Sequence, residues 1–105
     1  MMNDINIVEK KCALSETSKI IGDYWNILIL RQLFTRPQRF SEFLGQIEGS
    51  TSATISQKLK QLAREGIIER KQFECIPPKV EYKLTSKGQK FEKVIIAVEQ
   101  LSKTF

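Results

Sequence analysis

Residues 50–88 constrain the fold of this chain most strongly, because they place an amphipathic helix directly before two short strands. The helix is predicted over residues 52–65. Its apolar residues recur at helical spacing and form one stripe that we expect to be buried: Ile55, Leu59, Leu62 and Ala63. Thr51 can cap the first turn through its hydroxyl, and Gly66 suits the left-handed conformation that ends many helices. The sequence itself therefore bounds this helix at both ends.

Two predicted strands, 67–73 and 80–84, follow the helix, and each shows partial alternation of apolar and polar residues. The Pro-Pro tip between them interrupts pairing, because proline has no N–H to donate. A short helix over 39–44 precedes the 52–65 helix, and a Gly-containing turn connects the two. Its apolar residues are expected to pack on the 52–65 helix: Phe40, Phe43, Leu44 and Ile47. This order predicts a winged helix-turn-helix, mainly α with a small β-hairpin (α+β).

The 105 residues suit one domain, with the helix-turn-helix over about 39–65 and the wing over about 67–85. No apolar run is long enough to cross a membrane, and the N-terminus lacks the charged start and apolar core of a leader. We therefore expect a cytoplasmic protein without a membrane partner.

The remaining segments suggest a homodimer. Asp23 can cap a helix over 24–34 that is apolar nearly all round, so this helix should occupy the core. Thr85 can cap a last helix whose apolar residues repeat at steps of three and four, a spacing that suits a partner helix. The predicted dimer interface comprises Phe91, Val94, Ile95, Val98, Leu101 and Phe105. Alternatively, this face covers its own domain. The dimerisation segments are placed at about 5–22 and 86–105.

Basic residues are concentrated in the predicted DNA-binding unit. Between residues 36 and 88 there are ten Lys and Arg against six Asp and Glu, which accounts for most of the net charge of +5. A basic surface attracts phosphates through counterion release, which gives affinity without sequence information. Double-stranded DNA is therefore the predicted partner, as an inverted repeat if the chain is a homodimer.

The outward face of the 52–65 helix carries no acidic side chain. Gln57 can pair with adenine, Lys60 can reach guanine, and Ala53 can contact a thymine methyl group. The side chains expected near the phosphate backbone are Arg39, Thr51, Ser52, Ser56, Arg64 and Lys79. For each polar residue, plain solvation is the alternative.

Four segments resemble the HxlR-type winged-helix transcriptional regulators: Gly22-Asp23-Tyr24-Trp25, Ile27-Leu28-Ile29-Leu30-Arg31, Arg39-Phe40-Ser41-Glu42-Phe43, and the Pro77-Pro78 wing tip continuing through Val80-Glu81-Tyr82 to Gly88. The resemblance runs from about Cys12 to Leu101. It implies a homodimer that forms through the N-terminal segment and the last helix. It also implies that the second helix of the motif enters the major groove and the wing lies at the minor groove.

The two cysteines raise the question of redox control. Lys10 and Lys11 would favour a reactive thiolate at Cys12, and the resemblance aligns Cys12 with a family cysteine through which some members sense electrophiles or oxidants. The alternative is that Cys12 is a small packing residue. Cys75 matches no family position.

Other functions are less well supported by the sequence. The chain has no histidine, no Gly-rich phosphate loop and no Cys-x-x-Cys motif, so we expect neither an enzyme nor a metal or cofactor site. A winged-helix protein–protein interaction module is the main alternative, because the fold alone does not specify DNA. Such a module would present apolar anchors where this helix presents Gln57, Lys60 and Arg64. The sequence does not identify an inducer.

Overall fold

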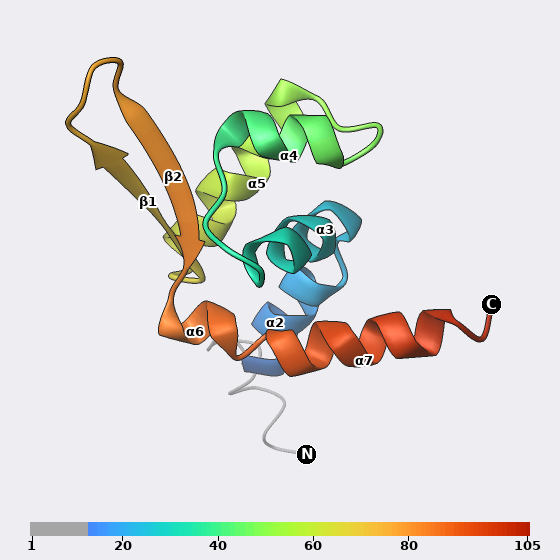
Figure 1. Cartoon of the computed structure of the whole chain (residues 1–105). Coiled ribbons are helices and arrows are strands. Elements are labelled where there is room, and N and C mark those ends of the chain that lie inside the picture. The colour runs from blue at the N-terminus through green and yellow to red at the C-terminus, as the bar shows by residue number, and fades with distance from the viewer. Residues whose placement is uncertain (1–12) are drawn as a thin grey trace.

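The computed structural model describes residues 13–105 and contains six helices and one hairpin in that range. The elements in chain order are α2 (Ala13–Ile21), α3 (Tyr24–Leu33), α4 (Phe40–Gln46), α5 (Ser52–Arg64), β1 (Ile68–Phe73), β2 (Lys79–Leu84), α6 (Ser86–Gln89) and α7 (Glu92–Ser102). The hairpin projects beside α5, and α7 extends away from it on the other side of α3 (Figure 1). This arrangement confirms the predicted winged helix-turn-helix.

Helix α3 is the centre of the domain and contacts α2, α5, α7 and β2. Asp23 caps it as predicted, since its carboxylate accepts the N–H of Asn26 at 3.1 Å. The buried apolar side chains come from every element except α6: Ile20, Ile29, Leu30, Leu33, Phe43, Ile47, Ile55, Leu59, Leu62, Ile67, Ile68, Leu84 and Ile95. Burial of this set from segments far apart in the chain holds the helices in place.

The hairpin has a simple antiparallel register in which Ile68 faces Leu84 and Phe73 faces Lys79. The pair Ile68 and Leu84 is buried at the base of the wing, whereas residues 69–72 of β1 are exposed and residues 79–82 of β2 are half-buried. Gln38, which precedes α4, forms an additional antiparallel bridge to Tyr82 through backbone bonds of 2.9 and 2.8 Å. The wing is therefore attached to the segment that joins α3 to α4.

The second helix of the motif has the predicted ends. Thr51 accepts the N–H of Thr54 at 3.2 Å, and Gly66 adopts the expected positive φ of +74°. One prediction about this helix was wrong: Ala63 is exposed. At roughly 100° per residue, Ala63 lies well to the side of the direction shared by Ile55, Leu59 and Leu62, so it falls outside the stripe that the core covers.

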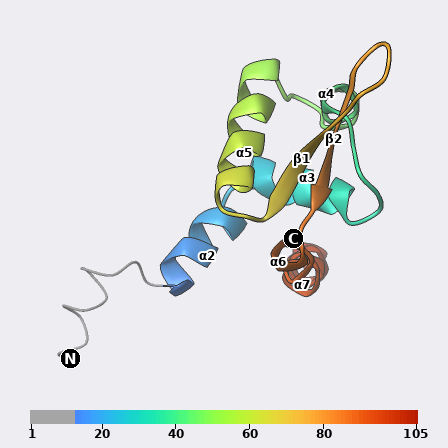
Figure 2. The ribbon, with the colours of Figure 1, turned by 90° about the vertical axis from the view of Figure 1, so that its left-hand side faces the viewer.

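The C-terminal region departs from the single helix that the sequence predicted. Thr85 does cap a helix, accepting the N–H of Gly88 at 3.1 Å, but α6 ends after one turn. The N–H groups of Lys90 and Phe91 bond to carbonyls three residues earlier, which is the pattern of a tight 3₁₀ turn, and α7 then begins. In Figure 2 the two helices lie below α3, on the side away from the wing.

The predicted dimer residues divide between the core and the surface. Ile95 is fully buried within its own chain, where α7 packs on α3, so its placement at a partner interface is corrected. Phe91 and Val98 are half-buried. Val94 is 40% exposed, Leu101 63%, and Phe105 fully exposed. The N-terminal part of the chain contributes helix α2, which the sequence analysis did not predict.

Candidate nucleic-acid interface

The outward face of α5 is the centre of the candidate site. Ala53, Gln57, Lys60 and Arg64 are all exposed, as the helical spacing predicted. None of the three polar side chains forms a hydrogen bond or an ion pair within residues 13–105. Bonds to base edges or phosphates would therefore replace only bonds to water. Ser52 is exposed and Ser56 half-buried beside them, and the Thr51 hydroxyl is occupied by its capping bond.

Lys58 lies on the inward side of α5 and has a different role. Its ammonium pairs with the Asp23 carboxylate at 2.5 Å, and the two side chains are only 17% and 25% exposed. Burial acts to raise the pKa of Asp23, but hydrogen bonds from Lys58 and from the Asn26 N–H outweigh it and leave that pKa below its ordinary value. The cap of α3 therefore also anchors α5. The sequence analysis missed this pair, because 35 positions separate the two residues.

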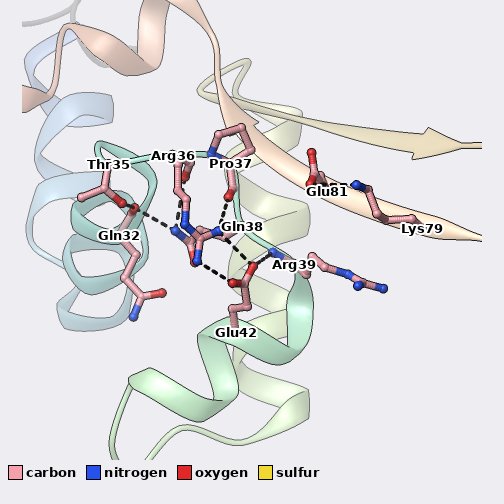
Figure 3. Close-up of polar contacts among 9 residues, drawn as sticks. All are labelled: Gln32, Thr35, Arg36, Pro37, Gln38, Arg39, Glu42, Lys79 and Glu81. Atoms are coloured by element: carbon pink, nitrogen blue, oxygen red, sulfur yellow. Dashed lines mark hydrogen bonds and ion pairs between the residues drawn. The ribbon is translucent and has the colours of Figure 1, made fainter.

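Arg39 stands at the start of α4, where Figure 3 shows its side chain directed away from the helix. Its backbone N–H donates to the Glu42 carboxylate at 2.7 Å. The Arg36 guanidinium pairs with the same carboxylate at 2.6 Å. This ion pair and the hydrogen bond from the Arg39 N–H together lower the pKa of Glu42. The Arg36 charge is therefore compensated locally. The Arg39 guanidinium has no such partner among residues 13–105 and remains available to an anion.

Lys79 begins β2, and its ammonium already has partners within the chain, which the sequence did not suggest. Its ammonium lies 3.5 Å from Glu81 and 4.8 Å from the centre of the Phe73 ring. Figure 3 shows Lys79 and Glu81 side by side on the strand. Lys71 approaches the same ring at 5.1 Å and has no acidic partner in the described part of the chain. Lys71 is therefore a second wing cation that the sequence analysis overlooked, although strand alternation places it on the same face as Phe73.

The described residues give no indication of a metal or membrane site. They contain no group of three or more Cys, Asp or Glu side chains placed to hold a metal ion. No helix within residues 13–105 has the length and apolarity needed to cross a bilayer. Cys75 is exposed near the wing tip as a free thiol, while Cys12 lies outside the described residues.

Comparison with known proteins agrees with this geometry. Residues 20–105 match the family model of the HxlR-like helix-turn-helix. The uncharacterized HTH-type transcriptional regulator sll1512 of Synechocystis sp. is 36% identical over 90 residues, which cover 86% of this chain and 67% of that protein.

Two solved structures extend the comparison. The oxidized form of the redox regulator HypR superposes with a TM-score of 0.83 and 26% identity, covering 90% of this chain and 97% of that one. The reduced form of the transcriptional regulator YodB from B. subtilis gives a TM-score of 0.78 and 30% identity, covering 91% and 95%. Both likenesses extend over nearly the whole of the two chains compared.

Proposed function

Because the chain belongs to the HxlR-like helix-turn-helix family of transcriptional regulators, we propose that it binds a specific DNA sequence as a homodimer. The observation that carries this proposal is the exposed, acid-free face of α5 beside a wing that bears Lys71 and Lys79. In this arrangement α5 enters the major groove, and the wing contacts the flanking backbone. Gln57 and Lys60 read base edges, whereas Arg39 and Arg64 hold phosphates.

The assay is fluorescence anisotropy with DNA selected from a random pool, compared with a scrambled duplex over a salt series. Gln57→Ala should cost about 1–3 kcal/mol on the selected site and relax the preference at one base pair. Arg39→Ala should weaken binding to both duplexes and reduce the salt slope by about 0.9. Lys93→Ala is the matched control, since Lys93 is an exposed lysine of α7 on the far side of α3. Equal losses from the first two variants on both duplexes would refute these roles.

The exposed apolar residues of α7 support the homodimer. Val94, Leu101 and Phe105 expose 40%, 63% and 101% of their surface in the single chain, and burying apolar surface of this kind favours association. A homodimer places two α5 helices against two half-sites, so the selected DNA should be an inverted repeat. Leu101→Glu should shift the sedimentation coefficient to that of a monomer. Ile76→Glu, at the fully exposed wing tip, should leave it unchanged, and a dimeric Leu101→Glu variant would contradict the proposed interface.

Redox control through Cys12 is a second element of the proposal. It is supported by the similarity to HypR, a protein described as a redox regulator, and by the two lysines that precede Cys12. Diamide should lower DNA affinity in the wild type and in Cys75→Ser, but not in Cys12→Ser. The Cys75→Ser control is needed because Cys75 is an exposed thiol that diamide can also reach. Unchanged affinity of the treated wild type would exclude the switch.

A further inference from the structure

The tip of the wing presents an apolar side chain that its own domain does not cover. Residues 74–78 join β1 to β2, and Figure 1 shows this loop at the outermost end of the hairpin. Ile76 is fully exposed, and the two prolines that follow it are exposed as well. Because Ile76 buries no surface within its own chain, removing its side chain should leave the stability of the fold unchanged.

The loop holds Ile76 outward through bonds of its own. The Cys75 N–H donates to the Phe73 carbonyl at 3.1 Å, and the Cys75 thiol donates to the Pro77 carbonyl at 3.2 Å. The thiol therefore turns back onto the loop, whereas the adjacent Ile76 side chain is directed to solvent. Pro77 and Pro78 each fix one backbone dihedral angle. A tip with so little conformational freedom loses little entropy when it enters a groove.

Basic side chains stand beside this apolar tip. Arg70 and Lys71 are exposed on β1 and form no ion pair within the described part of the chain. Lys79, at the start of β2, pairs with Glu81. Glu74 is the only acidic residue of the loop itself. Three basic side chains therefore outnumber two acidic ones at the end of the wing, and this excess attracts phosphates.

The wing is placed and long enough to reach DNA next to the site of α5. β1 contacts α5, and Tyr82 of β2 is bonded through its backbone to Gln38, which precedes α4. The hairpin is therefore attached near both helices of the motif. Its six-residue strands span about 20 Å, whereas the major groove is about 12 Å wide. With α5 in the major groove, the tip extends past the phosphate backbone to the neighbouring minor groove.

An apolar tip on a basic hairpin suits a side chain that bends DNA. Proteins that bend DNA insert isoleucine, proline or similar side chains between two base pairs from the minor groove, which unstacks that step and kinks the duplex. Pyrimidine–purine steps are the most easily unstacked. We propose that Ile76 enters the minor groove beside the α5 site, opens a pyrimidine–purine step and bends the DNA. This inference rests on the proposed DNA-binding function and adds a preference at a step that no polar side chain reads.

The fluorescence of 2-aminopurine detects the opened step directly, because this base emits more strongly when it is unstacked. In the DNA selected for the wild-type chain, 2-aminopurine replaces the adenine of one flanking pyrimidine–purine step in each duplex. Saturating protein should raise the emission several-fold at one step in each half-site and not at the others. Dyes on the two ends of the same duplex should show increased energy transfer, because a bend brings the ends closer together.

Variants assign the effect to one side chain. Ile76→Ala should abolish both signals and the preference for a pyrimidine–purine step over a G·C-rich step, which should be about tenfold in the wild type. Ile76→Leu should keep both signals, because leucine is also a wedge residue. Lys71→Ala should weaken binding to every duplex but keep both signals at saturation. Ile96→Ala, at an exposed isoleucine of α7, is the matched control and should change neither signal.

The outcomes separate the wedge from DNA binding itself. Saturated wild-type complexes with straight DNA and no rise in emission at any flanking step would overturn the wedge and leave the proposed function intact. Signals that persist in Ile76→Ala would overturn the assignment to Ile76. Absence of specific DNA binding by the wild type would overturn the proposed function and the wedge with it. Urea unfolding of Ile76→Ala should match the wild type, so a lost signal is not a folding defect.

Discussion

Replacement of Asp23 tests how α5 is held on the domain. Asp23→Ala removes both the cap of α3 and the ion pair with Lys58, whereas Asp23→Asn retains an oxygen that can accept the Asn26 N–H. A cap is worth about 1 kcal/mol. A hydrogen bond to a charged group is worth about 1.5–3 kcal/mol when well shielded, and the partial exposure of this pair brings its contribution toward the lower figure. We expect losses of about 2–3 kcal/mol for Asp23→Ala and about 1–2 kcal/mol for Asp23→Asn.

Urea unfolding monitored by the fluorescence of Trp25, the only tryptophan, measures these losses. Trp25 lies two positions from Asp23 and packs partly buried against the core. Lys58→Met leaves the cap of α3 intact and should cost about 1–2 kcal/mol. The double variant Asp23→Asn with Lys58→Met should then be about 1 kcal/mol more stable than the sum of the single losses predicts. All variants are compared at one protein concentration, because association adds to apparent stability.

The pH dependence gives an independent check of the same pair. The pKa of Asp23 is lowered in the folded chain, so its charge contributes stability that is fully present above the unfolded pKa of about 3.9. That contribution is lost as the pH falls through the lower, folded pKa. The stability difference between wild type and Asp23→Asn should therefore be constant near neutral pH and narrow below about pH 4. Additive losses in the double variant, or a difference that persists in acid, would refute the role assigned to this pair.

Further predictions concern backbone approach and burial. Gly88→Ala should destabilise the fold by about 3 kcal/mol or more, because a Cβ would overlap the backbone oxygen of Ile67. Gly45→Ala should instead raise the stability by about 0.5–1 kcal/mol, because its Cβ would meet no atom within 4 Å. Thermal unfolding measures both changes, and a tolerated Gly88→Ala would contradict the packing of α6. Ile95→Ala should lower the free energy of unfolding in urea by about 2–5 kcal/mol, because Ile95 is fully buried. Ile96→Ala should lower it by less than about 1 kcal/mol, because Ile96 is 45% exposed. Similar losses from the two variants would contradict the orientation of α7.

Some features of this protein follow from the sequence alone because they depend on neighbouring residues. The caps formed by Asp23, Thr51 and Thr85 each involve a backbone N–H three positions later, so a local pattern is sufficient to predict them. The left-handed turn at Gly66 follows from its lack of a Cβ. The outward face of α5 was also predictable, because helical geometry places residues 53, 57, 60 and 64 on one side.

Other features were decided only by the tertiary structure. The pairing of Lys58 with Asp23 and the burial of Ile95 both depend on how separate helices pack. Helical periodicity gives the direction in which a side chain points from the helix axis, but it does not identify the residue of another segment that packs against that side chain. The packing of α7 on α3 buried Ile95, although the spacing within its own helix had placed it at a partner interface. The local chemistry of the chain determined the elements and their ends, whereas contacts between distant segments determined which side chains remain available to a partner.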